Sequence, residues 1–380
     1  MHRGSLYIGL MSGTSLDGVD AALVEFGPAA PDGAGSPRQD AKPRTLATHY
    51  APFIPELRAA LAALQAPSEN EMHRAALAAN DLVRAYADAV QALLESAALN
   101  ASHISAIGAH GQTVRHRPEQ GFTIQLNNPA LLAELTGITV VADFRSRDVA
   151  AGGQGAPLAP SFHQAVFSDT RRHRAIINIG GIANLTSLAP DGQVAGFDTG
   201  PGNGLMDTWI AQHLRQPYDA GGAWAASGRV ITPLLEKLLG EPFFRQAPPK
   251  STGRDLFNAD WLARQLAGDE APADVQATLC ALTADSIGAA LGSLRQAARG
   301  ELDAFVCGGG AHNAQLMSAL RSAAPDITWG HTDELGVPAD WVEAVAFAWL
   351  ARQTMQNRPG NIAAVTGARG ARVLGAVYPA

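Results

Sequence analysis

Apolar and polar positions along the 380-residue chain follow two periods, which predicts strands interleaved with helices. Apolar runs at 6–11 and 19–26 flank a glycine-bearing turn and predict a first hairpin. Further strand-like runs occur at 104–109 and 138–142, and the second is β-branched, as is typical of a buried strand. Strands that alternate with helical segments favour an α/β fold.

Helical spacing of apolar residues is clearest after Ser68 and Glu71, which form a capping-box signal. We expect one amphipathic helix from there to about residue 100. Further helices are predicted at 275–299, from 313 and from about 340, with a strand at 302–307. The last residues, 373–377, fit a strand or a tail, and 28–43, rich in Pro and Gly without periodicity, fits a surface loop.

The segment 174–188 repeats the order of strand, glycine turn and strand seen in the first hairpin. It lies near mid-chain, where a second copy of a domain would begin. The length of the chain also favours two domains. We therefore expect two similar halves.

Composition limits the class of protein. No run approaches the roughly 20 apolar residues that a bilayer requires, and 1–6 is too short and polar for a signal peptide, which predicts a cytoplasmic protein without a membrane partner. The net charge of −7 argues against a nucleic-acid partner. Cys280 and Cys307 lie in apolar runs and are predicted to be buried, reduced thiols.

Glycine is abundant, at 39 residues, and gathers in clusters between strand-like runs. The tip of the first hairpin, between Gly13 and Gly18, offers hydroxyl and backbone N–H groups that suit a phosphate. The alternative is a tight turn whose side chains satisfy their own backbone. No Walker-type loop occurs, so a nucleotide site must have another design.

A second glycine turn, 198–203, opens a predicted helix at about residue 205. Free N–H groups and the helix dipole favour phosphate there. Asp198 just ahead of the turn is unsuited to bind phosphate, because like charges repel, but is suited to accept a proton. The alternative is that Asp198 caps the helix.

Three consecutive glycines at 308–310 stand between a strand and a helix. Without Cβ atoms they allow a flat ring such as adenosine to approach the backbone. A plain connection between strand and helix fits equally well.

Two arginines, Arg145 and Arg147, follow the β-branched strand and precede a glycine loop that contains Gln154. Arginine binds carboxylates through two parallel hydrogen bonds. A structural ion pair with Asp143 or Asp148 is an equal alternative.

Three further residues are candidates. His110 and Gln112 end another strand, at the edge where α/β sheets bind ligands. His110 and His116 lack a third ligand with zinc spacing. Glu343 lies in the first turn of an otherwise apolar helix, where it is either stabilised by the dipole or part of an active site.

The three glycine loops occur in the order used by the actin, Hsp70 and sugar-kinase superfamily. The amino-acid sequence, including these loops, resembles that of the anhydro-N-acetylmuramic acid kinase family over nearly the whole chain. The motifs that carry this resemblance are GLMSGTSLDGVD at 9–20, GQT at 111–113, DFR at 143–145, GGQGAP at 152–157, NIGGIAN at 178–184, DTGPGN at 198–203 and CGGG at 307–310.

The resemblance implies a two-domain actin-like ATPase of the ribonuclease-H-like α/β fold, with an interdomain active-site cleft. We expect residues 1–143 with 358–380 to form domain I, and 144–357 to form domain II. It also implies a homodimer and a kinase that opens the 1,6-anhydro bridge of anhydro-N-acetylmuramic acid by hydrolysis. The kinase would then phosphorylate O6 with ATP and Mg²⁺, during cell-wall recycling.

The resemblance also assigns residues. Asp198 would be the base that activates water, and Glu343 would orient the water or the sugar. Asp17 is the expected Mg²⁺ ligand, since the first strand carries Gly9, Leu10 and Met11 where other superfamily members carry an acid. The expected ATP-binding residues are Gly13, Thr14, Ser15, Leu16, Asp17, Gly18, Val19, Asp20, Gly181, Gly200, Gly202, Asn203, Gly308, Gly309, Gly310 and Asn313. The expected substrate-binding residues are His110, Gln112, Arg145, Arg147 and Gln154.

Two other functions fit the same fold. One is a hexokinase-like kinase in which Asp198 deprotonates a sugar hydroxyl. The other is an actin-like or Hsp70-like nucleotide switch. A switch would not need the polar groups of Arg145 and Gln154, and no long peptide-binding extension follows the nucleotide domains.

Overall fold

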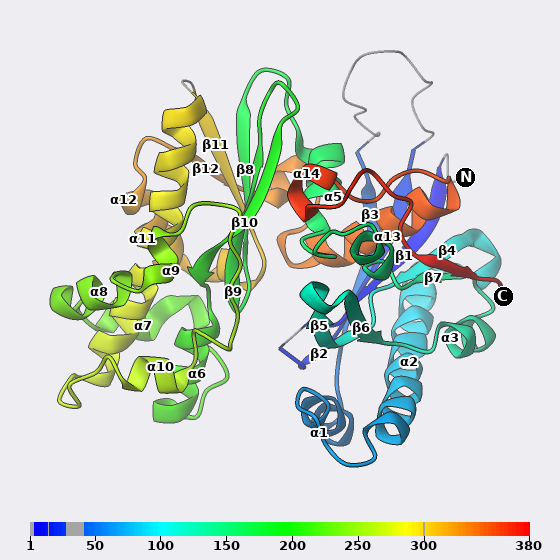
Figure 1. Ribbon diagram of the computed structural model, residues 1–380, viewed down its shortest axis with the longest axis horizontal. Helices are drawn as coiled ribbons and strands as arrows, with labels where there is room; N and C mark the ends of the chain where they lie inside the picture. The colour runs from blue at the N-terminus through cyan, green and yellow to red at the C-terminus, as the bar shows by residue number, and fades with distance from the viewer. Residues whose placement is uncertain (1–3, 14, 28–41, 299–300) are drawn as a thin grey trace. The chain divides into compact units, whose positions relative to one another are not determined.

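The computed structural model describes residues 4–13, 15–27, 42–298 and 301–380. The described chain divides into two compact units, Met1–Val166 with Gly336–Ala380 and Phe167–Leu335 (Figure 1). Thr14 and most of the loop predicted at 28–43 lie outside the described residues.

The first unit is built on a six-stranded sheet in the order β13-β7-β4-β1-β2-β3. β1, β2 and β3 are antiparallel neighbours, whereas β4 and β7 continue parallel to β1. A separate hairpin joins β5 to β6. The strands are β1 Ser5–Met11, β2 Gly18–Phe26, β3 Arg44–Pro52, β4 Ile104–Ala109, β5 Gln112–Arg117, β6 Phe122–Leu126, β7 Val140–Ala142 and β13 Ala376–Tyr378.

The second unit is built on a five-stranded sheet in the order β10-β9-β8-β11-β12. Again three antiparallel strands are followed by two parallel ones. Both sheets therefore share the order 3-2-1-4-5, which is the ribonuclease-H-like topology, and the expected fold class and duplication are confirmed. The strands are β8 His173–Ile179, β9 Ile182–Leu188, β10 Val194–Pro201, β11 Leu302–Cys307 and β12 Thr328–His331.

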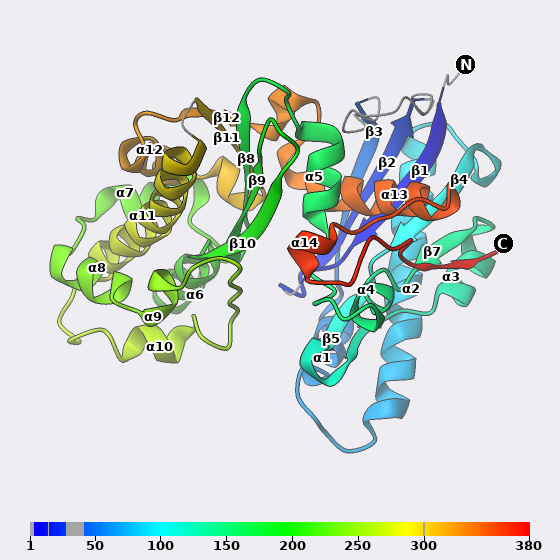
Figure 2. The same cartoon turned by 45° about the horizontal axis from the view of Figure 1, so that its top comes forward.

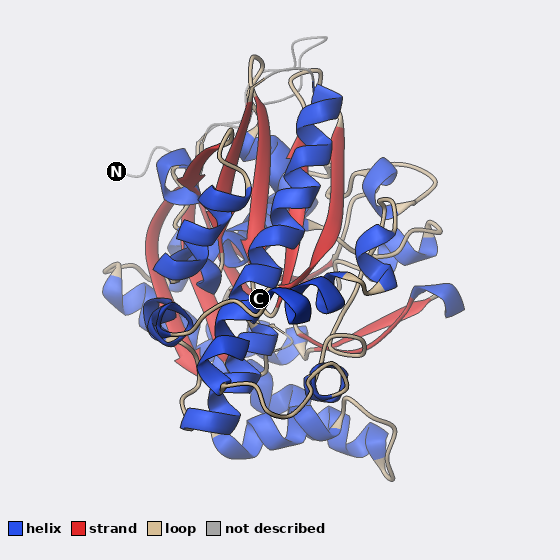
Figure 3. Ribbon diagram, turned by 90° about the vertical axis from the view of Figure 1, so that its left-hand side faces the viewer, coloured by secondary structure: helices blue, strands red, loops and turns tan. Residues whose placement is uncertain are grey.

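Helices cover both sheets, and the predicted helices are found within a few residues of their expected ends. Figure 3 shows helices of the second unit lying against the strands of its sheet. The described helices are α1 Pro55–Ala63, α2 Glu71–Ser96, α3 Pro129–Thr136, α4 Ser146–Ala150, α5 Ala159–Phe167, α6 Gly204–Leu214, α7 Ala223–Ser227, α8 Thr232–Leu239, α9 Pro242–Arg245, α10 Ala259–Ala263, α11 Pro272–Ala298, α12 Ala314–Ala323, α13 Val342–Met355 and α14 Ala363–Thr366.

The first sheet is buried on both faces by two long helices. Leu6, Ile8 and Leu10 of β1 share a hydrophobic core with the apolar face of α2. Gly9 points the other way, toward α13, because side chains alternate along a strand. Figure 2 shows α13 crossing over β1 and β4.

A pair of glycines lets α13 approach the sheet at backbone distance. Gly9 and Gly108 are register partners on β1 and β4. A Cβ on Gly9 would overlap the carbonyl oxygen of Ala344, and one on Gly108 would overlap that of Phe347. This close approach fixes the start of α13, which carries Glu343.

The compact units have different ends from the domains expected from the sequence. Residues 144–166 and 336–357 lie with the first unit. The reason is that α13 packs on β1 and β4, and the segment after β7 is anchored to 360–370 by hydrogen bonds such as Gln154 N to Thr366 O, 2.7 Å.

Gly9→Ala is predicted to destabilise the first unit by about 1–3 kcal/mol or more, because α13 must move away from β1. Gly292→Ala is the matched control. A Cβ on Gly292, in helix α11, would meet no atom within 4 Å, so the helix should gain about 0.5–1 kcal/mol. Urea unfolding measures both changes, and equal midpoints for Gly9→Ala and the parent would contradict this account of α13.

Helix α11 is more apolar than expected. Among the described residues, Pro272–Gln296 is long and apolar enough to cross a membrane, yet 61% of its most apolar window is buried within the structure. It packs against α7, α8, α12 and β10, as a core helix does. The predicted thiols Cys280 and Cys307 are both buried, and neither forms a disulfide.

Candidate active site

Two glycine turns of the second unit pack backbone against backbone. The turn between β8 and β9 holds Gly180 and Gly181, whose carbonyl oxygens accept from Asn203 N at 2.7 Å and Gly202 N at 3.0 Å. A Cβ on Gly202 would overlap the carbonyl oxygen of Gly180. A Cβ on Gly181 would meet nothing within 4 Å, so this turn borders open space where a ligand has room.

The third glycine loop lies beside the same turn. A Cβ on Gly308 would overlap Asn178 Oδ1, and one on Gly310 would overlap the side chain of Ile179. Gly309 lies near the side-chain amide of Asn203, which donates to Ile179 O at 3.1 Å. The glycine turns at 180–181, 198–203 and 308–310 thus form one surface where glycine leaves the backbone uncovered by side chains, which suits phosphate and a flat ring.

Asn313 caps the helix that follows the third glycine loop. Its Oδ1 accepts from Leu316 N at 2.9 Å and caps α12. Gly200 lies in β10, at a bulge directly after Asp198 and Thr199.

Asp198 is not a helix cap. It lies within β10, whereas α6 begins at Gly204 with Asn203 as its N-cap residue. The Asp198 carboxylate accepts from Thr252 N at 2.9 Å, and its backbone N–H donates to Lys250 O at 3.0 Å. The helix-cap alternative from the sequence is therefore wrong.

The environment of Asp198 suits a base. Burial raises the pKa of this carboxyl to about 6, although the Thr252 N–H opposes the rise. Its cross-strand neighbour on β9 is Asn184, which in turn pairs with Asn178 on β8. A carboxylate with a pKa near neutrality can take up a proton during a reaction and release it afterwards.

A hydrogen bond from Gln112 stabilises the turn of the first hairpin. Gln112 is buried and its amide Nε2 donates to Gly13 O at 3.1 Å. Ser15 Oγ donates to Asp17 Oδ1 at 2.5 Å, and Leu16 has a left-handed backbone with φ of 57°. Gln112 therefore supports the predicted phosphate turn.

Carboxylates gather beside that turn. Burial raises the pKa of Asp20, at the start of β2, to about 7, and the charges of Asp17, Glu343 and Asp340 raise it further. Desolvation by the surrounding protein also raises the pKa of Glu343, although the residue keeps an exposed surface, and the Arg145 charge opposes the rise. These acids come from two ends of the chain, brought together because α13 lies against β1.

The carboxylates of Asp17 and Asp20 could bind a cation that also binds phosphate. Within the described part of the chain, no group of three or more His, Cys, Asp or Glu side chains is placed to hold a metal ion alone. Mg²⁺ is commonly held by one or two carboxylates together with phosphate oxygens. Asp17, with Asp20 beside it, fits that pattern.

Arg145 is held in place by two acceptors. Its Nε and Nη2 lie 3.1 and 2.9 Å from His110 Nε2, and its Nη1 donates to Gly155 O at 2.8 Å. Burial lowers the pKa of His110 well below its usual range, and the Arg145 charge lowers it further, so the ring is a neutral acceptor. The charge of Glu343 stabilises the guanidinium.

The aspartates expected as partners of the arginines bind other groups. Asp143 Oδ1 accepts from Ser146 Oγ. Asp148 is fully buried and accepts from Gly155 N, Asn361 Nδ2 and Thr366 Oγ1. Asp148 thus anchors the glycine loop that carries Gln154.

Arg145 is half-buried, while Arg147 and Gln154 are exposed. The structure brings His110 and Arg145 together and leaves Arg147 apart from this contact.

Sequence reasoning missed Thr252, Asn184 and Asp340. Thr252 lies 54 residues from the carboxylate it binds, so no local spacing signals the contact. Asn184 appears within the NIGGIAN motif, and strand register alone places it opposite Asp198.

Sequence comparison with known proteins identifies one family. A family model described as "Anhydro-N-acetylmuramic acid kinase" matches residues 5–380. Proteins named anhydro-N-acetylmuramic acid kinase from Bordetella petrii and Nitrosospira multiformis are 56% and 54% identical, and the alignments cover 99% and 100% of this chain and 97% and 100% of theirs. A solved ROK family glucokinase from Streptomyces griseus in complex with glucose and AMPPNP has 16% identity and a TM-score of 0.40, covering 92% of this chain and all of that one.

Proposed function

Because the chain belongs to the anhydro-N-acetylmuramic acid kinase family, we propose that it opens the 1,6-anhydro bridge of this sugar and phosphorylates O6, with Asp198 as the base. The family match confirms the resemblance expected from the motifs, and the chain is a kinase. The observation that carries the assignment of Asp198 is a half-buried carboxylate, with a raised pKa, next to a phosphate-type glycine turn.

The proposed reaction needs a base because water attacks an acetal carbon poorly until a proton is removed. The water oxygen forms a bond to C1 while the bond from C1 to bridging O6 breaks, and Asp198 takes the proton of the water. The freed O6 then attacks the γ-phosphorus of ATP, and ADP leaves. The products are N-acetylmuramic acid 6-phosphate and ADP.

ATP is the proposed nucleotide, supported by family membership and by the bare backbone around Gly181, Gly202 and Gly309. Mg²⁺ is the proposed metal, held by Asp17 with Asp20 nearby. When bound, Mg²⁺ would neutralise phosphate charge. Both acids lie at one hairpin, and a cation there would offset their mutual repulsion.

Arg145 is the proposed partner of the lactyl carboxylate, since its guanidinium is already oriented by His110 and Gly155. Glu343 is proposed to orient the water or the sugar. These residues belong to the first unit, and Asp198 belongs to the second. A cytoplasmic location and a homodimer are proposed on family resemblance.

The direct test is incubation of the protein with ATP, Mg²⁺ and anhydro-N-acetylmuramic acid, followed by mass spectrometry. The proposed product exceeds the substrate by one water and one phosphoryl group. A hexokinase-like kinase would add only the phosphoryl group to a free sugar, and a nucleotide switch would leave the sugar unchanged.

The pH profile gives an independent test. Burial raises the pKa of Asp198 to about 6, and only its ionised form accepts a proton. kcat should therefore fall as pH decreases through about 6 and reach a plateau above it. An acidic limb near pH 4, the range of an exposed aspartate, would contradict the buried-base assignment.

A further inference from the structure

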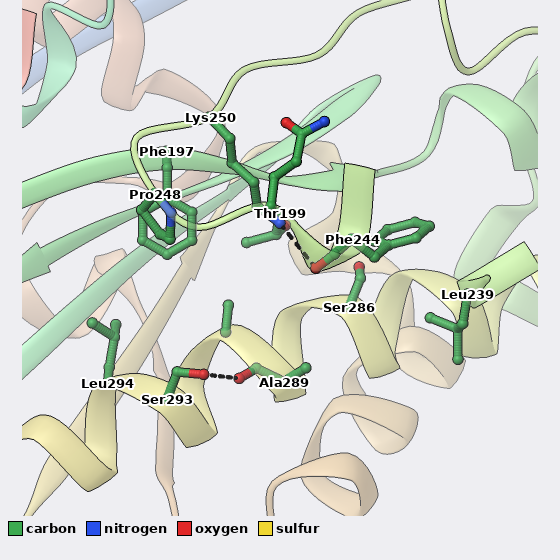
Figure 4. Close-up of a pocket in the computed structure, with 12 residues that line it drawn as sticks. Phe197, Thr199, Leu239, Phe244, Pro248, Lys250, Ser286, Ala289, Ser293 and Leu294 are labelled. Carbon is green, nitrogen blue, oxygen red and sulfur yellow. Dashed lines mark hydrogen bonds between the residues drawn. The ribbon is translucent and has the colours of Figure 1, made fainter. Parts of the chain in front are cut away.

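The second unit contains a pocket on the face of β10 opposite Asp198. It has a volume of about 240 Å³ and lies among β10, the loop before Lys250 and α11 (Figure 4). Phe197 and Thr199 line it, whereas Asp198 is not part of the lining, because successive side chains of a strand such as Phe197 and Asp198 point to opposite faces. Its main apolar walls are Phe197, Leu239, Phe244, Pro248 and Leu294.

The size and lining of the pocket select a small aromatic molecule. A dry apolar cavity of about 150 Å³ holds benzene, so this pocket has room for one ring with a short substituent. Its hydroxyls are engaged with the backbone: Thr199 Oγ1 donates to Ala183 O, Ser286 Oγ to Thr283 O and Ser293 Oγ to Ala289 O. The pocket therefore offers mainly apolar contact.

Lys250 supplies the one charged group of this lining. Its Nζ donates to Phe243 O at 3.2 Å and Phe244 O at 3.4 Å, and lies 4.5 Å from the centre of the Phe243 ring. An ammonium has three N–H donors, so a third is available to a ligand. Lys250 forms no ion pair with a carboxylate in the described part of the chain, and an anionic group of a ligand would fill that role.

The walls of the pocket also hold the proposed base. Lys250 O accepts from Asp198 N, and two residues later Thr252 N donates to the Asp198 carboxylate. On the strand, Gly200 is so close to Phe244 that a Cβ there would lie 2.7 Å from its ring. A ligand that displaces Phe244 or 248–250 therefore changes the contacts of Asp198.

We propose that this pocket is a regulatory site for a small aromatic carboxylate, with its ring between Phe197 and Phe244 and its carboxylate on Lys250. The regulatory part rests on the proposed function of Asp198. Occupancy lowers kcat, by about fivefold or more if the coupling is of ordinary allosteric size, because it disturbs the segment that positions the carboxylate.

The test uses 3-phenylpropionate as the probe, 3-phenylpropan-1-ol as its uncharged match, and calorimetry with the full chain. We expect the acid to bind with Kd below about 1 mM and the alcohol at least tenfold more weakly. Ala290→Trp fills the pocket and should abolish binding, whereas Gln296→Trp, on the same helix outside the lining, should not. Ser293→Phe, at an exposed position of the lining, is a second blocking variant should Ala290→Trp not fold.

Turnover is then measured with and without the probe. The parent and Gln296→Trp should be inhibited, and the blocked variants should not respond. No binding by the parent, equal binding of acid and alcohol, or binding retained in the blocked variants would overturn the site. Binding without any change in kcat would overturn the regulatory role. Because calorimetry needs no catalysis, a protein inactive toward the sugar would count against the proposed function alone.

Discussion

Asp198→Asn is expected to lower kcat by about a hundredfold or more, with little change in the binding of ATP or sugar, on the scale of general-base contributions. The amide keeps the size of the side chain and can still accept from Thr252 N, but it cannot take a proton from water. Steady-state kinetics measures the effect. Asp191→Asn, in the turn between β9 and β10, is the matched control and should retain parental turnover.

The same variant should fold normally, which separates loss of a base from loss of structure. Burial raises the folded-state pKa of Asp198 above its unfolded value, so the folded protein binds the proton more tightly. The stabilisation from that proton is therefore lost as pH rises through about 6, and at pH 8 the ionised carboxylate disfavours folding. Asp198→Asn removes this cost, and its Tm at pH 8 should equal or exceed that of the parent. Near-normal turnover with unchanged binding would assign the base elsewhere, with Glu343 as the first candidate.

Some strands could be predicted closely because their signal is local, whereas β3, β5, β6 and β12 were not predicted. Alternation and apolar runs located β1, β2 and β4 within about a residue of their observed ends, and the repeat at 174–188 indicated the second sheet. The position of helix α13 on the first sheet could not be predicted from local sequence. It is buried nearly all round, so its sequence has no polar face that tells which sheet it covers. Its place depends on Gly9 and Gly108, more than 200 residues away, and the expected domain ends differed for that reason.

The candidate site was predictable where glycine turns carry it and unpredictable where side chains meet across the fold. In the second unit the glycine turns at 180–181, 198–203 and 308–310 lie together. In contrast, the contact of Arg145 with His110, the support of Gly13 by Gln112 and the link between Asp198 and Thr252 join distant segments. No spacing encodes them, because each arises from sheet order and loop packing.

The contact with His110 distinguishes two arginines that the sequence left equivalent. Arg145 has its Nε and both terminal nitrogens held by His110 and Gly155, so it loses little conformational freedom when it binds a carboxylate. Arg147 is exposed on α4 and lacks this support. If the substrate carboxylate pairs with one arginine, preorganisation favours Arg145.

Arg145→Ala should therefore raise KM for the sugar by about tenfold or more, the effect of losing a charged hydrogen bond, and should lower kcat much less. Arg147→Ala, the matched control on the same helix-and-loop segment, should change KM less than about twofold. Arg145→Lys should fall between them, because it keeps the charge but not the paired donors. The Arg145 charge also opposes the rise in the Glu343 pKa, so that pKa should increase further in Arg145→Ala. Initial rates over a range of sugar concentrations decide the matter: an unchanged KM in Arg145→Ala, or an equal rise in both alanine variants, would place the carboxylate on another group.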